Sequence, residues 1–268
     1  MEITVIGLLL GLLLLALPIY IVCAFHLGLL RRLGVSLARM TAAVALLGAV
    51  IALLMRYDRL WLNIVAGVVL ALLSSVAIVA RSGLRQGRLL GAVAAATLAS
   101  LIVLVPYVLL VVVSAPAPFS TRLLIPVVCL LAGSASGLTA RALRAYYIGL
   151  EHHGELYYYL LGNGATHREA VRHFMRRGFQ AALLPAMKRM SALLLTGAPT
   201  LMLALVMSGV GVWTAAILDI LLAVAVIGCA LATFWLSVLL SRRYAFDAYE
   251  RLRPMKRGPQ PTDPPAKE

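Results

Sequence analysis

The chain has 268 residues, of which 62% are hydrophobic and only 13% are charged, and its mean hydropathy is +0.97. Soluble domains carry about twice that share of charged residues, so the composition excludes a soluble protein and indicates a polytopic membrane protein. The net charge of +14 comes from basic residues in short segments between apolar stretches, which argues against nucleic-acid binding.

Apolar segments of membrane-crossing length follow one another along the chain. The first five are residues 3–30, 40–55, 60–80, 89–121 and 123–140, and the second is short unless it begins near Val35. The stretch 190–241 holds a single charge, Asp219, and divides at residues 208–211 into a sixth helix and a seventh that starts near Val212. Because a crossing takes about 20 apolar residues, we expect an all-α protein of about seven transmembrane helices, with six and eight as the alternatives.

Charges between these segments predict the orientation. Arginines follow the first, third and fifth segments, whereas the other connections hold few charges or none. Basic loops stay in the cytoplasm, so the N-terminus is predicted outside and the C-terminus inside. We expect residues 1–244 to form the transmembrane domain and residues 245–268 to form a polar, Pro-rich and partly disordered cytoplasmic tail. Glu2 and the long uncharged run after it favour a retained first helix over a signal peptide.

One polar segment, residues 141–189, interrupts this pattern between the fifth and sixth helices. It holds eight Arg or Lys, four His and three Glu residues. Residues 146–161 are predicted to form one helix that the glycines at 162 and 164 end. Thr166 and Glu169 have the spacing of a capping box, which begins a second helix.

The second predicted helix is basic and amphipathic. Arg168, Arg172 and Arg176 recur on one face, while apolar residues such as Phe174 lie on another. A bent helix pair of this kind can bind both the underside of a membrane and an acidic groove of a soluble partner. The four histidines lack the spacing of a zinc site and are expected to be solvated or to face a partner.

Several short motifs occur in a fixed order in this half of the chain. The run GATHREAVR at 164–172 is followed by Arg176-Arg177 and by AALLP at 181–185. Ile125-Pro126 and Gly133 precede these motifs, and Pro199, Met202 and Ser208-Gly209 follow them. Over about residues 123–222 the chain resembles a diverged member of the FetB-like family of ABC transporter permeases, which are of an iron-export type.

The resemblance implies the membrane-spanning permease subunit of an ABC transporter in the bacterial cytoplasmic (inner) membrane. Such a subunit works as a homodimer with a separate ATPase, hydrolyses nothing itself and exports a metal ion or small solute, so neither enzyme activity nor a cofactor is expected. The segment 141–189 resembles the coupling helices on which the ATPase docks. The residues that match the coupling motif are Gly164, Ala165, Thr166, Arg168, Glu169, Arg172 and Arg176.

The candidate substrate pathway is less like the family. Ser134 follows Gly133 where the family has Asn, GAPTLM at 197–202 stands where it has SLPGMM, and Asp219 replaces a Gln. The candidate pathway residues are Gly133, Ser134, Pro199, Met202 and Asp219. No metal-ligand set is apparent, so the cargo stays open.

Three of the five pathway residues also have a structural explanation. A charge at the bilayer centre costs about 2.5 to 3.5 kcal/mol, so Asp219 either binds a cation or proton, or lies near the headgroups or a neighbouring helix. Gly133 serves close helix packing or contacts a ligand. Met202 serves as a core residue or a thioether ligand.

Two other functions are compatible with the sequence. The first is a membrane-embedded scaffold or sensor whose basic loop recruits a soluble partner or anionic lipid. The second, an intramembrane enzyme using Asp219 with His26, is disfavoured because the predicted topology places these residues toward opposite faces of the membrane.

Overall fold

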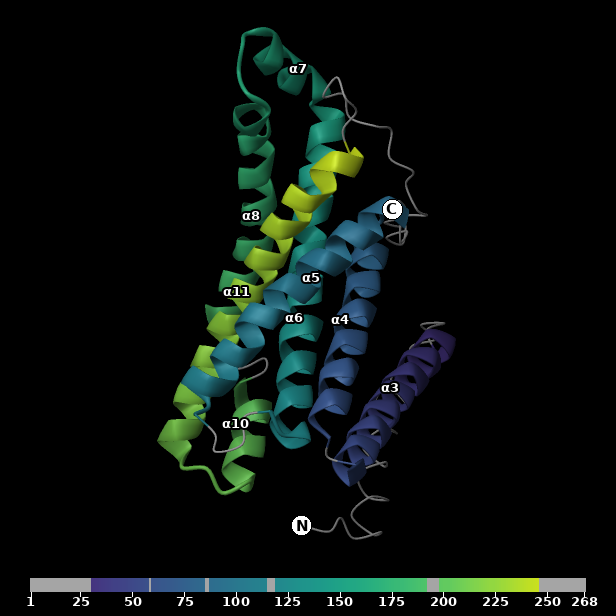
Figure 1. Ribbon diagram of the computed structural model, residues 1–268, viewed down its shortest axis with the longest axis vertical. Helices are drawn as coiled ribbons and strands as arrows, with labels where there is room; N and C mark the ends of the chain where they lie inside the picture. The colour runs from purple at the N-terminus through teal and green to yellow at the C-terminus, as the bar shows by residue number, and fades with distance from the viewer. Residues whose placement is uncertain (1–29, 58, 85–86, 115–118, 192–197, 246–268) are drawn as a thin grey trace. The chain divides into compact units, whose positions relative to one another are not determined.

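The computed structural model describes residues 30–57, 59–84, 87–114, 119–191 and 198–245. The elements within these ranges are helices, as the sequence predicts (Figure 1). The chain divides into two compact units, Met1–Tyr57 and Asp58–Glu268. The division of the chain into a domain of residues 1–244 and a tail of residues 245–268 stays a prediction, since the tail lies almost entirely outside the described residues.

The first unit contains helix α3, Leu30–Tyr57. Most of its large apolar side chains are exposed, including Met40, Val44 and Leu46, as expected for a helix whose surroundings are lipid. The helix begins before Val35, so the second predicted segment is long enough to cross a membrane. The first predicted segment, residues 3–30, lies outside the described residues except for its last position.

The second unit is a bundle built around one long central helix, α6. Its elements are α4 Leu60–Ser82, α5 Gly87–Tyr107 with the π-helical continuation η1 Val108–Val112, α6 Thr121–His152, α7 Gly154–Gly162, α8 His167–Ser191, α10 Ala198–Met207 and α11 Val212–Ala245. Helix α6 packs against α4, α8 and α11, and α5 packs against α11 and α4 (Figure 1). The large buried side chains of α6, including Ile125, Leu131 and Tyr146, form the core of the bundle.

Five helices in the described part of the chain are long and apolar enough to cross a membrane. Their spans are Leu33–Tyr57, Leu60–Ser82, Leu89–Val112, Thr121–His152 and Val212–Ala245. These spans confirm a multi-pass helical membrane protein. Of the sixth predicted crossing the structure describes helix α10, and residues 192–197 before it lie outside the described ranges. The count of seven crossings and the orientation of the termini stay predictions.

The predicted division between the sixth and seventh helices is confirmed. Helix α10 ends at Met207 and α11 begins at Val212. Between them Gly209 has a φ of +94°, a left-handed conformation that glycine adopts without steric cost.

Hydroxyl groups join the helices of the bundle. Ser100 of α5 and Thr233 of α11 share a 2.6 Å hydrogen bond, and so do Tyr147 of α6 and Ser241 of α11. Near the start of α6, the hydroxyl of Thr121 donates to Asn63 of α4 at 2.9 Å. Small hydroxyl side chains allow close helix contact and satisfy each other where water is absent.

One glycine sets the distance between three helices. A Cβ on Gly178 of α8 would overlap the ring of Phe234 on α11 and lie 3.2 Å from the carbonyl oxygen of Ala142 on α6. The Phe234 ring is fully buried, and its centroid is 5.0 Å from that of Phe179 and 6.3 Å from that of Tyr146. Because these rings surround it, Phe234 has little room to move aside, so a side chain at position 178 would force the ring or the helix crossing to shift.

We predict that Gly178→Ala lowers the stability of the protein by about 1 to 3 kcal/mol, the usual cost of overpacking a tight core. Gly228→Ala in α11 is the matched control, because a Cβ there meets nothing within 4 Å. The measurement is the thermal midpoint of the purified protein in detergent. Equal midpoints for the two variants would contradict the close packing of α8.

Candidate functional site

The polar segment forms a helical hairpin, hereafter the coupling hairpin, made of α7 and α8. The expected single helix over residues 146–161 is wrong: α6 ends at His152, and α7 begins at Gly154. His153 between them leaves the helical region, with φ −113° and ψ 36°. The physical reason is a tertiary contact, since the bend brings the buried Tyr157 hydroxyl to within 2.8 Å of Nδ1 of His167.

This contact also corrects the expectation for one histidine. His167 is 8% exposed and packs edge-on against Tyr157, so it fastens α7 to α8 instead of facing solvent. His152, His153 and His173 are exposed, as the sequence predicts. Within the described ranges there is no group of three or more His, Cys, Asp or Glu residues that could hold a metal ion.

The turn of the hairpin has the predicted chemistry. Helix α7 ends at Gly162, and Asn163 follows it with its side-chain amide donating to the carbonyl of Tyr159 at 3.0 Å. Gly164 has a φ of +84°, a conformation that other residues rarely adopt. The chain then enters α8 through Thr166, whose carbonyl accepts the first helical hydrogen bond from Ala170 at 3.0 Å.

One half of the predicted capping box is present, the half in which the Glu169 side chain accepts hydrogen bonds from Thr166. The backbone N–H and the hydroxyl of Thr166 both donate to Oε2 of Glu169, at 2.8 and 2.9 Å. The N–H bond, followed by the hydroxyl bond, lowers the pKa of Glu169 below its ordinary value, because both favour the ionised carboxylate. The negative charge also lies in the first turn of α8, where the helix dipole stabilises it.

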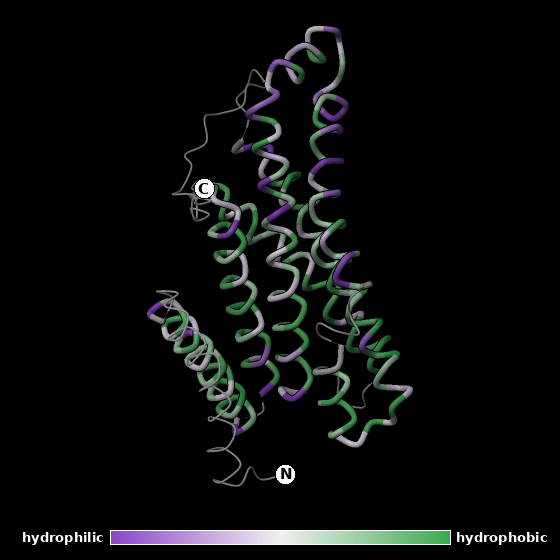
Figure 2. Tube along the Cα trace, turned by 180° about the vertical axis from the view of Figure 1, so that it is seen from behind, coloured by the Kyte–Doolittle hydropathy of each residue, from purple (hydrophilic) through white to green (hydrophobic). Residues whose placement is uncertain are grey.

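The two faces of α8 are divided as predicted. Ala170, Phe174 and Gly178 are buried, and Phe174 lies beside Gly149 of α6. The basic row and most of the other matched residues are exposed: Gly164, Thr166, Arg168, Glu169, Arg172 and Arg176, with Ala165 partly exposed. Hydrophilic residues accordingly gather at the hairpin end of this unit (Figure 2).

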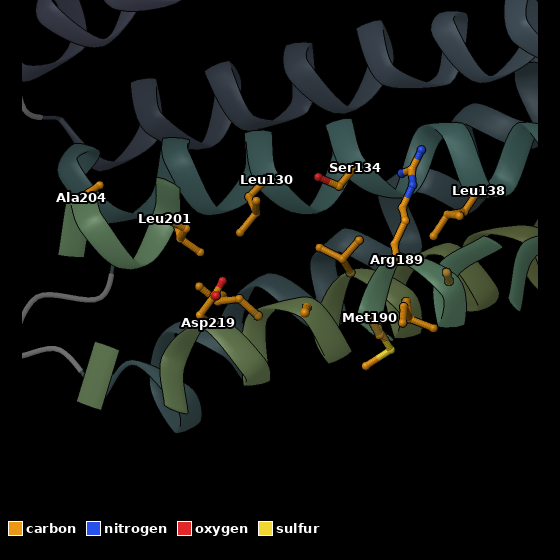
Figure 3. Close-up of a pocket in the computed structure, with 13 residues that line it drawn as sticks. Leu130, Ser134, Leu138, Arg189, Met190, Leu201, Ala204 and Asp219 are labelled. Atoms are coloured by element: carbon orange, nitrogen blue, oxygen red, sulfur yellow. The ribbon is translucent and has the colours of Figure 1, made fainter. Parts of the chain in front are cut away.

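A second site lies within the bundle, between α6, α10, α11 and the end of α8. It is a cavity of about 510 Å³, here called the membrane cavity (Figure 3). Most of its wall is aliphatic. The lining residues are Leu130, Ser134, Leu138, Ala186, Arg189, Met190, Leu201, Ala204, Asp219, Leu222, Ala223, Val226 and Ile227.

Asp219 is the acidic group of the membrane cavity. It is 9% exposed, and its carboxylate points into the space between α10 and α6 (Figure 3). No Lys, Arg or His of the described residues forms an ion pair with it. Arg189 and Met190 line the opposite end of the cavity, beside Leu138, and Ser134 lies between the two ends (Figure 3).

The structure brings together only part of the predicted pathway. Ser134 and Asp219 line one cavity, whereas Gly133 is exposed on another face of α6 and Met202 is partly buried in α10 away from the cavity wall. Pro199 belongs to α10, but its side chain lies outside what the structure describes. The prediction for Asp219 as a residue of the last helix is confirmed, and its role in binding stays a prediction.

The sequence reasoning missed the aliphatic wall. On α6 the lining residues Leu130, Ser134 and Leu138 are four positions apart, and on α11 the wall follows Asp219 at helical spacing through Leu222 and Val226. This periodicity was the available signal. It was hard to recognise because nearly every neighbouring position is also apolar, so the hydrophobic pattern alone does not separate a cavity face from a lipid face.

Residues 5–246, almost the whole chain, match the model of a family described as "Uncharacterised protein family (UPF0014)". The chain belongs to the UPF0014 family. This is the family of the FetB-like ABC transporter permeases, so the resemblance seen in the sequence is confirmed, and the departures around Ser134 and Asp219 are consistent with a diverged member. No curated protein and no solved structure matches the chain significantly.

We expect the hydrogen bonds to Glu169 to make the hairpin turn of this UPF0014 protein depend on pH. Because the folded pKa of Glu169 is lowered, the stabilisation is fully present above the pKa of an unfolded glutamate, about 4.3, and is lost as the pH falls through the folded pKa. We expect hydrogen–deuterium exchange to show stronger protection of the first turn of α8 in the wild type than in Glu169→Ala at neutral pH. In acid, the protection of this turn should become equal in the two proteins. A difference in protection that persists unchanged in acid would contradict the capping role.

Proposed function

We propose that the chain is the membrane-spanning permease subunit of an ABC transporter that exports a metal cation or a small cationic solute, driven by a separate ATPase. The coupling hairpin is the observation on which the proposal depends. It presents Arg168, Arg172 and Arg176 along one exposed face, one helical turn apart, while the opposite face is buried against α6. Such a face is complementary to an acidic groove on a soluble partner.

The hairpin is fastened to the helices that line the membrane cavity. Phe174 packs beside Gly149 of α6, and Gly178 leaves no room for a Cβ between the Ala142 carbonyl of α6 and the Phe234 ring of α11. A partner that rotates the hairpin therefore moves α6 and α11 with it. Movement of packed helices as bodies is the ordinary route from ATP-driven closure to alternating access.

The membrane cavity supports a cationic cargo. A buried carboxylate in aliphatic surroundings is unfavourable unless a positive charge or proton compensates it. Among the described residues Asp219 has no ion-pair partner, since Arg189 lines the opposite end of the cavity. A cation bound between Asp219 and Ser134 provides that compensation. We propose a homodimer with two such cavities, in the inner membrane of a bacterium, with the hairpin on the cytoplasmic side.

The docking role predicts the outcome of a charge reversal. Arg168→Glu, Arg172→Glu and Arg176→Glu together should weaken association with the ATPase at least about a hundredfold, because like charges then face each other across the interface. The matched control changes the same three residues to Lys and should retain most of the affinity. The measurement is co-purification and a binding isotherm with the ABC ATPase that associates with the wild-type protein.

Unchanged association of the Glu variant would contradict docking on the hairpin. If the ATPase bound normally but no substrate stimulated ATP hydrolysis, the result would favour the scaffold or sensor over the permease.

The pathway role of Asp219 predicts a specific transport defect. Asp219→Asn should reduce export at least about tenfold in reconstituted vesicles, because the neutral amide cannot compensate a cation. Asp219→Glu is the control that keeps the charge and should retain part of the activity. ATPase association should be equal in both variants, and full transport by the Asn variant would remove Asp219 from the pathway.

A further inference from the structure

A second cavity lies on the outside of α6, where α8 crosses it. It has a volume of about 430 Å³ and is here called the basic cavity. Five of its eight lining residues are Arg or His, and none is acidic. The lining residues are Arg141, Arg144, Ala145, Ile148, Gly149, His152, His153 and Arg177.

Helix geometry gathers these residues from two elements. Those of α6 recur at three- and four-residue intervals, so they form one stripe along the helix. Arg177 comes from α8, and its neighbour Gly178 is held against the carbonyl of Ala142. Because Ala142 directly follows Arg141, the close crossing brings the guanidinium-bearing positions of α6 and α8 together on a rigid base.

Within the part of the chain that the structure describes, no carboxylate forms an ion pair with the arginines of the basic cavity. Arg141, Arg144 and Arg177 are permanently charged. Arg141 and Arg177 are exposed and Arg144 is half-buried, so water screens part of their mutual repulsion, and a bound anion would lower it further. The membrane cavity is different in this respect, since an acidic residue, Asp219, and a basic residue, Arg189, line its opposite ends.

The shape and chemistry of the site favour a phosphate group. Guanidinium groups donate pairs of hydrogen bonds that match phosphate oxygens, and the two exposed histidines add further nitrogen atoms at the rim. Ala145, Ile148 and Gly149 form an apolar floor between the charged groups. Arg141 is the first charged residue after the apolar run 123–140, so the site lies where α6 reaches the headgroup layer.

We propose that the basic cavity binds a phosphate group, carried by an anionic phospholipid headgroup or present as a free phosphate ion, and that this anion fastens α8 to α6. The bound phosphate lies beside the crossing through which the hairpin moves the bundle. The site is separate from the exposed row Arg168, Arg172 and Arg176, so it does not depend on ATPase docking.

The test uses the full-length protein, delipidated in a neutral detergent. Thermal unfolding, followed by tryptophan fluorescence, is measured during titration with phosphatidylglycerol, with inorganic phosphate at constant ionic strength, and with phosphatidylcholine as the neutral lipid. We expect the midpoint to rise with phosphatidylglycerol, with phosphate, or with both, and to stay constant with phosphatidylcholine. A response to phosphatidylglycerol alone identifies the lipid headgroup as the source, and a response to inorganic phosphate identifies the free ion.

Two matched triple variants locate the site. Arg141→Gln, Arg144→Gln and Arg177→Gln together should weaken the response at least about tenfold, because charge-assisted hydrogen bonds to the phosphate are lost. Arg168→Gln, Arg172→Gln and Arg176→Gln remove the same charge from the same segment and should bind phosphate like the wild type. If the cavity triple variant does not fold, Arg177→Gln alone replaces it, because this side chain is exposed. This single variant should weaken the rise of the midpoint by a smaller factor.

The proposal is overturned if neither anion raises the midpoint, if phosphatidylcholine acts equally well, or if both triple variants weaken the response equally. ATPase association is measured on the same variants. A cavity variant that loses phosphate binding but keeps the ATPase supports the proposal even if the permease function fails. A cavity variant that loses the ATPase, in a protein on which phosphate has no effect, overturns it and assigns the cavity to the docking surface.

Discussion

The close crossing of α8 over α6 and α11 is the constraint on which the rest of the structure depends. Gly178 has no side chain, and the ring of Phe234 and the carbonyl of Ala142 occupy the space where a Cβ would lie. The crossing fixes the root of the coupling hairpin and holds Arg177 beside the arginines of α6. The same two helices, α6 and α11, supply most of the wall of the membrane cavity. The exposed basic face, the basic cavity and Asp219 thus lie on helices that meet at the crossing of Gly178.

Local features of the sequence predicted local structure well. The Thr166–Glu169 contact, the turn at Gly164 and the exposed arginine row each depend on residues within a few positions of one another. The turn and the row are confirmed, and so is the half of the capping box in which Glu169 accepts from Thr166. The break at His153 was not predicted because it depends on the contact of Tyr157 with His167, which forms only after the hairpin has closed. In a uniformly apolar helix the sequence does not show which face lines a cavity, because that also depends on tertiary packing. The sequence therefore placed Asp219 in a helix, but it could not show that Ser134 faces the same cavity while Met202 does not.

Helix α6 connects the regions that the proposed function requires. Its 32 residues extend about 48 Å, which exceeds the hydrocarbon thickness of a bilayer. It begins at the Thr121 contact with α4, passes the membrane cavity at Ser134 and continues to His152 beside the basic cavity. A rigid element of this length can carry a displacement from the hairpin to the cavity without any change of local structure.

The central claim is that the hairpin, α6 and α11 move as one body relative to α10. The most direct measurement is a pair of spin-label distances in a background without Cys23, Cys129 and Cys229, one from His173→Cys on α8 to Trp235→Cys on α11 and one from His173→Cys to Leu203→Cys on α10. These three positions are exposed, so they accept labels. When the proposed ATPase partner binds ATP, we expect the first distance to stay constant and the second to change. A change in the first distance with a constant second one would contradict it.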